Sequence, residues 1–306
     1  MKLLYKLAPV GFIALAVLNL LPHLGLSVLS EWAASFLPFL LVYTLPAAGL
    51  LWILKLKWQW FLLLLPLLLW NLILLWPYLF PGALSEFDRH DALKVCAVNV
   101  HRINHRHQPI VDAIKKQKPD LVFVQEIDKA WEESLRAALS EDYSFIHAIP
   151  DDFNFGVMLL SKIPIQDLKV AYTTEYEMPY YNFRLDFKGK DYHFLAMHTY
   201  PPSSPSKLPW RNEQLALLGK LATANSIVMG DFNTATFSPA FRKLLKVGNL
   251  QDPRCQAGIL NTWHAKFPFL GSNIDHILVR KDLHYGKLKR LQDIGSDHLP
   301  LLLEIK

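Results

Sequence analysis

Three long apolar segments without formal charge open the chain, separated by Glu31 and by a short stretch that holds two lysines. Each is longer than the roughly 20 helical residues that cross a bilayer core. A helix on a soluble domain would present a polar face, which these leucine-rich segments lack. The pattern predicts a membrane domain over residues 1–83 with three transmembrane helices, at about residues 7–29, 32–54 and 58–80.

The few charges of this region predict its orientation. They are Lys2, Lys6, Glu31, Lys55 and Lys57. The lysines precede the first helix and lie between the second and third, and positively charged residues stay on the cytoplasmic side. Three spans then place the rest of the chain on the extracytoplasmic face. We therefore expect a multi-pass protein of the inner (plasma) membrane.

The pattern changes after about Pro81, where a charged segment at residues 84–92 predicts a linker. Beyond it, strand-like and helix-like segments interleave without the strict alternation of a doubly wound sheet. This predicts an α/β sandwich. The expected strands are residues 94–100, 121–125, 144–149, 155–161, 165–171, 182–187, 192–198, 227–230, 274–279 and 299–305, and the expected helices are 109–117, 131–139, 211–222 and a short one after Pro239.

Composition narrows the choice of function. Removing the four lysines and one glutamate of the first 83 residues from 32 basic and 27 acidic residues leaves 28 basic and 26 acidic. A nucleic-acid-binding domain is usually far more basic, so strong nucleic-acid binding is not indicated. The two cysteines, Cys96 and Cys255, exclude a disulfide scaffold and a cysteine-rich zinc module. Cys96 is expected in the core, and its pairing with Cys255 stays open.

Polar side chains recur at the ends of the predicted apolar strands or interrupt them. They are Glu126, Asp231, Asn233, Asp275, His276, Asp297 and His298. Burying such groups costs free energy unless they are paired or bound to a metal. Oxygen donors of this kind are the ligands that hard divalent cations prefer. Several of them in one domain indicate a common site for phosphate chemistry.

Seven short motifs in these positions resemble, in order and spacing, those of the endonuclease/exonuclease/phosphatase superfamily. The motifs are Val98-Asn99-Val100, Gln125-Glu126, Phe155-Gly156-Val157, His198-Thr199, Gly230-Asp231-Phe232-Asn233, Ile274-Asp275-His276 and Ser296-Asp297-His298. The resemblance covers about residues 93–305. It implies a four-layer α/β sandwich, with two packed mixed β-sheets flanked by helices, as a catalytic domain over residues 93–306. One departure is His276, where an aromatic residue or an arginine is common.

The resemblance also implies a metal site. Glu126 resembles the principal Mg²⁺ ligand, and Asn99 and Asp297 resemble residues that complete or support the coordination. Hard oxygen donors suit Mg²⁺ or Mn²⁺. We therefore expect a Mg²⁺-dependent hydrolase that acts on phosphoester bonds.

The remaining motif residues resemble the catalytic groups of the superfamily. His298 would pair with Asp275, which orients the imidazole and favours its charged form. Asp231 would orient or deprotonate the attacking water, while Asn233 and His198 would contact the phosphoryl oxygens. The implied reaction is one-step in-line hydrolysis of a phosphodiester or pyrophosphate.

The expected substrate is a lipid-linked phosphate, because anchoring the site beside the membrane raises its effective concentration for lipids. The aromatic segments at residues 172–183 and 200–210 either form an interfacial rim over the site or pack against each other. Two alternatives stay open: an envelope nuclease acting on DNA or RNA, and a non-catalytic membrane scaffold that binds phosphorylated partners.

A histidine-rich connection follows the first predicted strand of the soluble part. His101, His105 and His107 suggest a metal cluster, but they lie among charged residues without suitably spaced carboxylates, so a solvated loop is favoured. Arg102 and Arg106 of the same loop are candidate contacts to substrate phosphate.

Overall fold

The protein is described by a computed structural model that covers residues 2–53, 57–82, 91–173, 177–267 and 270–306. Its strands are β1 (Leu93–Asn99), β2 (Leu121–Gln125), β3 (Phe145–Ile149), β4 (Val157–Ser161), β5 (Gln166–Tyr172), β6 (Pro179–Phe187), β7 (Lys190–Met197), β8 (Ser226–Asp231), β9 (Leu250–Gln251), β10 (Asp275–Arg280), β11 (Lys289–Arg290) and β12 (Leu301–Ile305). The helices that lie between these strands in the sequence are α5 (Gln108–Gln117), α6 (Lys129–Leu139), α7 (Lys207–Leu221), α8 (Pro239–Gly248) and the short η2 (Pro253–Gln256).

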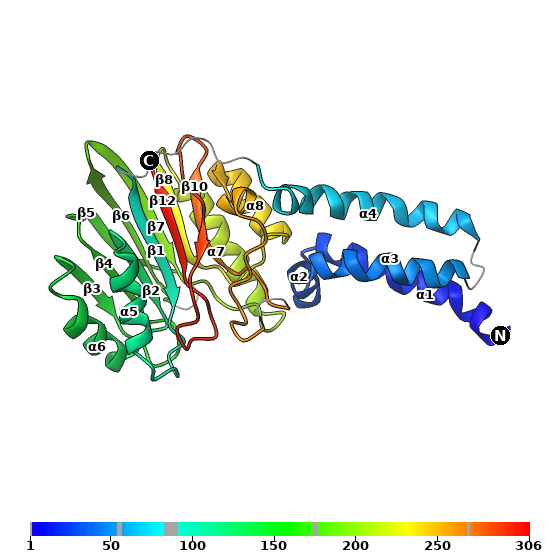
Figure 1. The fold of residues 1–306 in the computed structure, drawn as a ribbon, viewed down its shortest axis with the longest axis horizontal. Helices are drawn as coiled ribbons and strands as arrows, with labels where there is room; N and C mark the ends of the chain where they lie inside the picture. Colours follow the sequence, from blue (N-terminus) through cyan, green and yellow to red (C-terminus); the bar gives the residue numbers. More distant parts are fainter. Residues whose placement is uncertain (1, 54–56, 83–90, 174–176, 268–269) are drawn as a thin grey trace.

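The strands β1 to β12 form two six-stranded sheets that pack against each other (Figure 1). One sheet has the order β11-β12-β1-β2-β4-β3 and the other β5-β6-β7-β8-β10-β9. Each contains one parallel pair, β1 with β2 and β7 with β8, and its other pairs are antiparallel. The predicted sandwich of two packed mixed β-sheets is confirmed.

The burial of the strands explains why the sequence predicted them. Side chains such as Val95, Phe123 and Phe194 fill the space between the two sheets. The opposite faces pack under helices, α5 and α6 on the first sheet and α7 and α8 on the second. Strands covered on both faces consist of continuous apolar residues. The additional strands β9 and β11 have only two residues each, too few to leave a pattern.

The N-terminal region folds into helices whose limits differ from those predicted. They are α1 (Lys2–Leu20), η1 (Leu21–His23), α2 (Val28–Ser35), α3 (Leu37–Ile53) and α4 (Trp58–Leu79). Among the described residues, α4 alone is long and apolar enough to cross a membrane, and residues 8–23 with α2 pass the same test only as a pair bent by 94°. The shorter α3 has 17 residues. The predicted helices at 7–29 and 32–54 were therefore wrong in their limits.

Local signals account for the break between α1 and α2. Pro22 lies in the 3-10 turn that follows α1, and Gly25 has a φ of +60°. Ser27 then begins α2 with a capping box, in which Ser27 and Ser30 bond to each other's backbone N–H. Such caps stabilise a helix start, so the apolar run continues in a new direction. Residues 84–90 of the predicted linker lie outside the described residues.

Helix α2 packs against the sandwich through its one acidic residue. The carboxylate of Glu31 lies 2.8 Å from Nη2 of Arg211 in α7. It also accepts hydrogen bonds from the hydroxyls of Ser238, at 3.0 Å, and Thr234, at 3.3 Å. All four residues are buried. In the sequence, Glu31 indicated only the orientation of the predicted membrane helices. In the structure it joins these N-terminal helices to the sandwich.

Removing one partner of this ion pair is expected to destabilise the protein strongly. Arg211→Met leaves the Glu31 carboxylate buried without its counter-charge, which costs about 3–5 kcal/mol of unfolding free energy. Arg184→Met is the control, because Arg184 pairs with Asp191 at a partly exposed position, and such pairs contribute under about 1 kcal/mol. Thermal unfolding in detergent should show a much lower melting temperature for Arg211→Met alone, and equal melting would contradict a stabilising role for the pair.

Candidate active site

Residues from both sheets converge where the parallel strands end. Asn99 ends β1, Glu126 follows β2 and Asp231 ends β8. Gly230, with a φ of +140°, has no side chain, so the neighbouring strand β7 and the Gln125 side chain of the other sheet both approach β8 closely here. A Cβ at this position would overlap the carbonyl oxygen of Met197. The strands thus bring residues more than 130 positions apart into hydrogen-bond contact.

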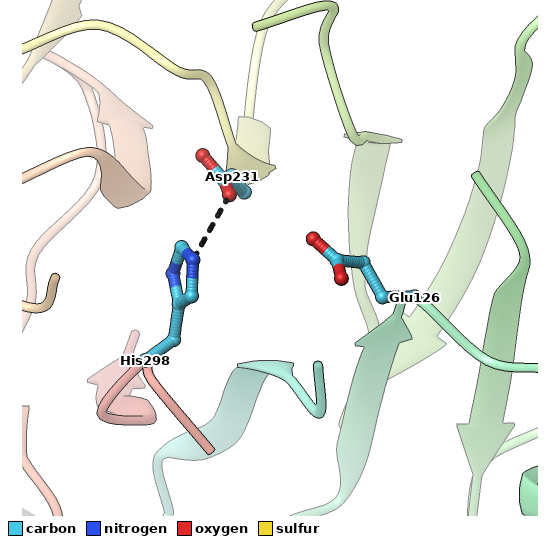
Figure 2. A group of neighbouring side chains, drawn as sticks. All are labelled: Glu126, Asp231 and His298. Carbon is cyan, nitrogen blue, oxygen red and sulfur yellow. Dashed lines mark ion pairs between the residues drawn. The ribbon is translucent and has the colours of Figure 1, made fainter. Parts of the chain in front are cut away.

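Glu126, Asp231 and His298 form the centre of the site (Figure 2). One ligand-capable atom from each lies within 4.8 Å of the other two. The side-chain amide of Asn99 donates to Glu126 Oε1 at 2.8 Å and to Asp231 Oδ2 at 3.2 Å. His298 Nε2 is 3.7 Å from Asp231 Oδ2, and its Nδ1 is 2.8 Å from Asp275 Oδ2. The expected contact between Asp275 and His298 is present.

The other predicted residues surround this centre. His198 Nε2 lies 3.7 Å from Asp231 Oδ2, and the Asn233 amide lies 3.3 Å from the same imidazole nitrogen. Asp297 Oδ1 lies 4.0 Å from His298 Nε2, at the edge of the group. All the residues that the sequence singled out for the metal and the catalytic steps are therefore brought together. Their individual roles remain predictions.

Two site residues have a left-handed backbone conformation. Glu126 has a φ of 61° and Asn233 a φ of 46°. Asparagine tolerates this region, whereas for glutamate it costs on the order of 1–3 kcal/mol. The turn directs the Glu126 side chain out of the line of β2 and toward Asp231 (Figure 2).

Burial and neighbouring charges shift the titration of the central pair. Burial lowers the pKa of His298, but the carboxylates of Asp275 and Asp231 outweigh it and raise this pKa to about 10. Burial and the charge of Asp275 raise the pKa of Asp231 to about 8, although His298 opposes the shift. Burial lowers the pKa of His198. At neutral pH the metal-free site therefore holds a charged His298 and a neutral His198.

The charge balance of the site suits a cation. Glu126, Asp231, Asp275 and Asp297 lie together, and within the described ranges no lysine or arginine forms an ion pair with any of them. Asp297 Oδ1 accepts no well-aligned hydrogen bond, although His101 Nδ1 lies 3.2 Å from it. An imidazolium cannot bind a metal ion, so the charged His298 would not be a ligand. The remaining oxygen donors fit a hard divalent cation such as Mg²⁺.

The Asp275 carboxylate is expected to set the protonation state of His298. Asp275→Asn removes the largest of the contributions that raise the His298 pKa, so this pKa should fall. NMR titration of histidine-labelled, metal-free protein should show His298 charged above pH 8 in the unsubstituted protein. In the variant its titration should move to lower pH. An unchanged titration would show that Asp275 does not act on this imidazole.

Several residues that contact the site were not predicted for it. Nδ1 of His101 lies 3.2 Å from Asp297 Oδ1, and the indole of Trp263 donates to Asp297 Oδ2 at 3.0 Å. Gln125 accepts from the backbone N–H of Asp231 through its side chain. Arg211 donates to the backbone oxygen of Asn233 at 2.9 Å. Only Gln125 had a sequence signal, as part of the Gln125-Glu126 motif.

Other side chains that attracted attention in the sequence have structural roles. His107 stacks on Trp131 with ring centroids 4.0 Å apart, away from His101. His276 lies against Phe232 and Phe241, and burial lowers its pKa well below the usual value. His276 is therefore a neutral core residue. Cys96 and Cys255 are both free thiols.

A pocket of about 560 Å³ lies over the site. Glu126, Asp231 and His298 form part of its lining, and Trp32 and Phe36 of α2 form another part. In the first aromatic segment, Met178, Tyr180, Tyr181 and Phe183 are buried and Tyr172 is exposed. Residues 174–176 lie outside the described residues, and none of the described ones lines the pocket. From the second aromatic segment, Pro201, Pro202 and Ser203 line the pocket.

Solved structures share this fold over about 70% of the chain. An endonuclease/exonuclease/phosphatase from Beutenbergia cavernae matches with a TM-score of 0.61 and 19% identity, over 71% of this chain and 72% of that one. D. rerio TDP2, complexed with a single strand DNA product, matches with a TM-score of 0.58 and 18% identity, over 70% of this chain and 99% of that one. Sphingomyelinase C from Streptomyces griseocarneus matches with a TM-score of 0.53 and 18% identity, over 70% of this chain and 99% of that one.

At these identities the structural likeness establishes the fold alone. A comparison with curated protein sequences gave no match. The sequence profile of the Endonuclease/Exonuclease/phosphatase family, in contrast, matches residues 96–298, about two-thirds of the chain. These residues include every predicted site position, from Asn99 to His298. The chain therefore belongs to the endonuclease/exonuclease/phosphatase family, whose members are phosphoester hydrolases.

Proposed function

We propose that this protein is a membrane-anchored, metal-dependent phosphoesterase that hydrolyses a phosphodiester or pyrophosphate bond of a lipid-linked substrate. The observation that carries the proposal is the group of four carboxylates around His298, without a lysine or arginine ion pair among the described residues. A group of carboxylates without such a pair, two of them buried, favours a bound cation. Family membership supplies the reaction type.

The metal-binding roles fall to the oxygen donors. Glu126 and Asp297 would hold Mg²⁺, or Mn²⁺ in its place, with Asn99 completing or supporting the set. Asn99 donates through its amide nitrogen to both Glu126 and Asp231 and so holds the two carboxylates in position. When bound, the divalent ion neutralises charge on the phosphoryl group and orients it.

The catalytic roles follow from protonation and geometry. Asp231, with its raised pKa near 8, is suited to accept a proton from the attacking water. His298, held charged by Asp275, stabilises the negative charge that develops on the phosphoryl oxygens. Asn233 and His198 also lie beside Asp231 and would donate hydrogen bonds to the same oxygens.

Membrane anchoring is supported by the arrangement of the N-terminal helices. Helices α1, α3 and α4 extend side by side from one end of the sandwich (Figure 1), and each contacts the other two. Large apolar side chains on their outer surfaces are exposed, among them Val10, Val42 and Leu63. A bilayer would cover such surfaces. We propose three spans with the catalytic domain, residues 93–306, on the extracytoplasmic face.

Three experiments test these proposals. A reporter fused after Lys306 should be active outside the cytoplasm, and cytoplasmic activity would overturn the orientation. Detergent-solubilised protein should hydrolyse a phospholipid in the presence of Mg²⁺ but not of EDTA, and should leave plasmid DNA intact. Consumption of DNA alone would establish the nuclease alternative. If Glu126→Ala and His298→Ala preserved a cellular phenotype that deletion of residues 93–306 abolished, the scaffold alternative would be correct.

A further inference from the structure

Helix α2 is held rigidly at the mouth of the active-site pocket. Its Glu31 carboxylate is bound by Arg211, Thr234 and Ser238, all buried. Arg211 also donates to the backbone oxygen of Asn233, so the segment that follows Asp231 is tied to α2. A wall built on such a fixed element has a defined position relative to the catalytic groups.

The opposite side of α2 is apolar and exposed. Leu29, Trp32 and Phe36 are spaced three and four residues apart and therefore share one helix face. Their exposed fractions are 60%, 58% and 41%. The helix thus buries its acidic residue and presents its apolar side chains outward, the reverse of a helix on a water-exposed surface. It is also bent by 94° from the preceding helix, the orientation expected of a helix lying along a membrane surface.

The lining of the pocket combines ionic and aromatic side chains. Glu126, Asp231 and His298 supply ionic groups, while Trp32 and Phe36 contribute aromatic surface. Phe155 and Trp263 add further aromatic surface from the sandwich. Among the described residues that line the pocket, none is a lysine or arginine. A polyanion would require such cations, whereas one phosphate attached to a hydrocarbon chain would not.

We propose that Trp32 and Phe36 form the binding site for the hydrocarbon chain of a membrane-lipid substrate whose phosphate lies at Glu126 and Asp231. This inference rests on the proposed phosphoesterase function and adds a specificity determinant to it. The N-terminal helices then do more than anchor the protein, because α2 supplies one wall of the substrate site. The volume of about 560 Å³ is within the range of small-molecule pockets and suits a head group with the adjoining part of a chain.

The test compares a lipid with a soluble substrate of the same chemistry. The full-length protein in detergent is assayed with Mg²⁺ on dioleoylphosphatidylglycerol and undecaprenyl diphosphate in mixed micelles, and on water-soluble bis(p-nitrophenyl) phosphate. Trp32→Ala combined with Phe36→Ala should lower kcat/KM for the hydrolysed lipid roughly 10- to 100-fold, the effect of losing large apolar contacts. The soluble ester should be hydrolysed within about twofold of the unsubstituted rate.

The matched control is Trp58→Ala. Trp58 is exposed to the same extent, 59% against 58% for Trp32, and it begins α4 at the end distant from the sandwich (Figure 1). It should leave both activities unchanged. Because Trp32, Phe36 and Trp58 are all exposed, the melting temperatures of the variants should stay close to that of the unsubstituted protein. If the double variant unfolds, Trp32→Ala and Phe36→Ala are assayed separately in its place.

The outcomes separate the two proposals. Hydrolysis of the soluble ester without any lipid hydrolysis would overturn the lipid site and preserve the phosphoesterase. Equal losses on both substrates, or no loss on the lipid, would also overturn the lipid site. The absence of metal-dependent hydrolysis of every ester would overturn the phosphoesterase and the lipid site together.

Discussion

Asp231→Asn is expected to lower kcat by roughly 10²- to 10⁴-fold, the usual contribution of a general base. Asparagine has the same shape, and its one carbonyl oxygen can still accept the hydrogen bond from the backbone N–H of Asn233, while its amide nitrogen replaces the oxygen that accepts from Asn99. It cannot accept the proton of the attacking water at neutral pH. The loss should therefore appear mainly in kcat, with KM changed little.

The pH profile gives this prediction a second readout. Because burial and Asp275 raise the pKa of Asp231 to about 8, kcat of the unsubstituted enzyme should rise with pH above the ordinary carboxyl range near 4. Bound metal would move this limb toward lower pH. The limb should vanish in Asp231→Asn and persist in Asp142→Asn, a control at an exposed position. Retention of the limb in Asp231→Asn would assign it to another group.

Glu126→Gln is expected to abolish the response of the protein to Mg²⁺. A ligand that binds only the folded state stabilises it by mass action, so Mg²⁺ should raise the melting temperature of the unsubstituted protein. The neutral amide at position 126 should remove that increase. Activity should fall by more than the 10- to 100-fold typical of residues that only support a metal ligand.

Two comparisons control this experiment. Glu133→Gln neutralises an exposed glutamate of α6 and should keep both the Mg²⁺-dependent increase and the activity. In the absence of metal, Glu126→Gln should melt no lower than the unsubstituted protein, because it relieves repulsion among the four carboxylates. A Mg²⁺-dependent increase of normal size in Glu126→Gln would exclude this residue as the principal ligand.

The sandwich and the composition of its site were predictable from the sequence for a physical reason. Strands such as β2 and β8 are buried on both faces, so their residues are apolar without interruption. A polar residue at the end of such a strand is conspicuous, which is how Glu126 and Asp231 were found. Their convergence follows from the parallel pairs, whose carboxyl ends lie at one edge of each sheet.

The limits of the N-terminal helices were less predictable, because hydropathy does not show where an apolar segment changes direction. The apolar run from residue 7 to residue 30 continues through Pro22 and Gly25 with no change in composition, yet the chain turns by 94° there. Glu31 likewise looks like a loop charge in the sequence. Its partner Arg211 is 180 positions away, and only the folded chain brings the two into contact.

The residues around Asp297 were missed for a similar reason. His101, in the connection after β1, and Trp263, in the loop before β10, reach this carboxylate from parts of the chain that are far apart in the sequence. His101 was instead grouped with His105 and His107 by proximity along the chain. Side chains that support a site from loops carry no periodic signal, so their roles depend on tertiary structure.

The contact of Glu31 with Arg211 has a consequence for the effect of proteolysis. Cleavage ahead of β1 would remove Glu31, the carboxylate that pairs with Arg211 in the intact chain. The same arginine donates to the backbone oxygen of Asn233, so the released fragment would lose the contact that holds Arg211 beside this loop. If the chain is anchored as proposed, release of residues 93–306 would thus lower the activity as well as detach it, and hydrolysis would stay confined to the intact chain.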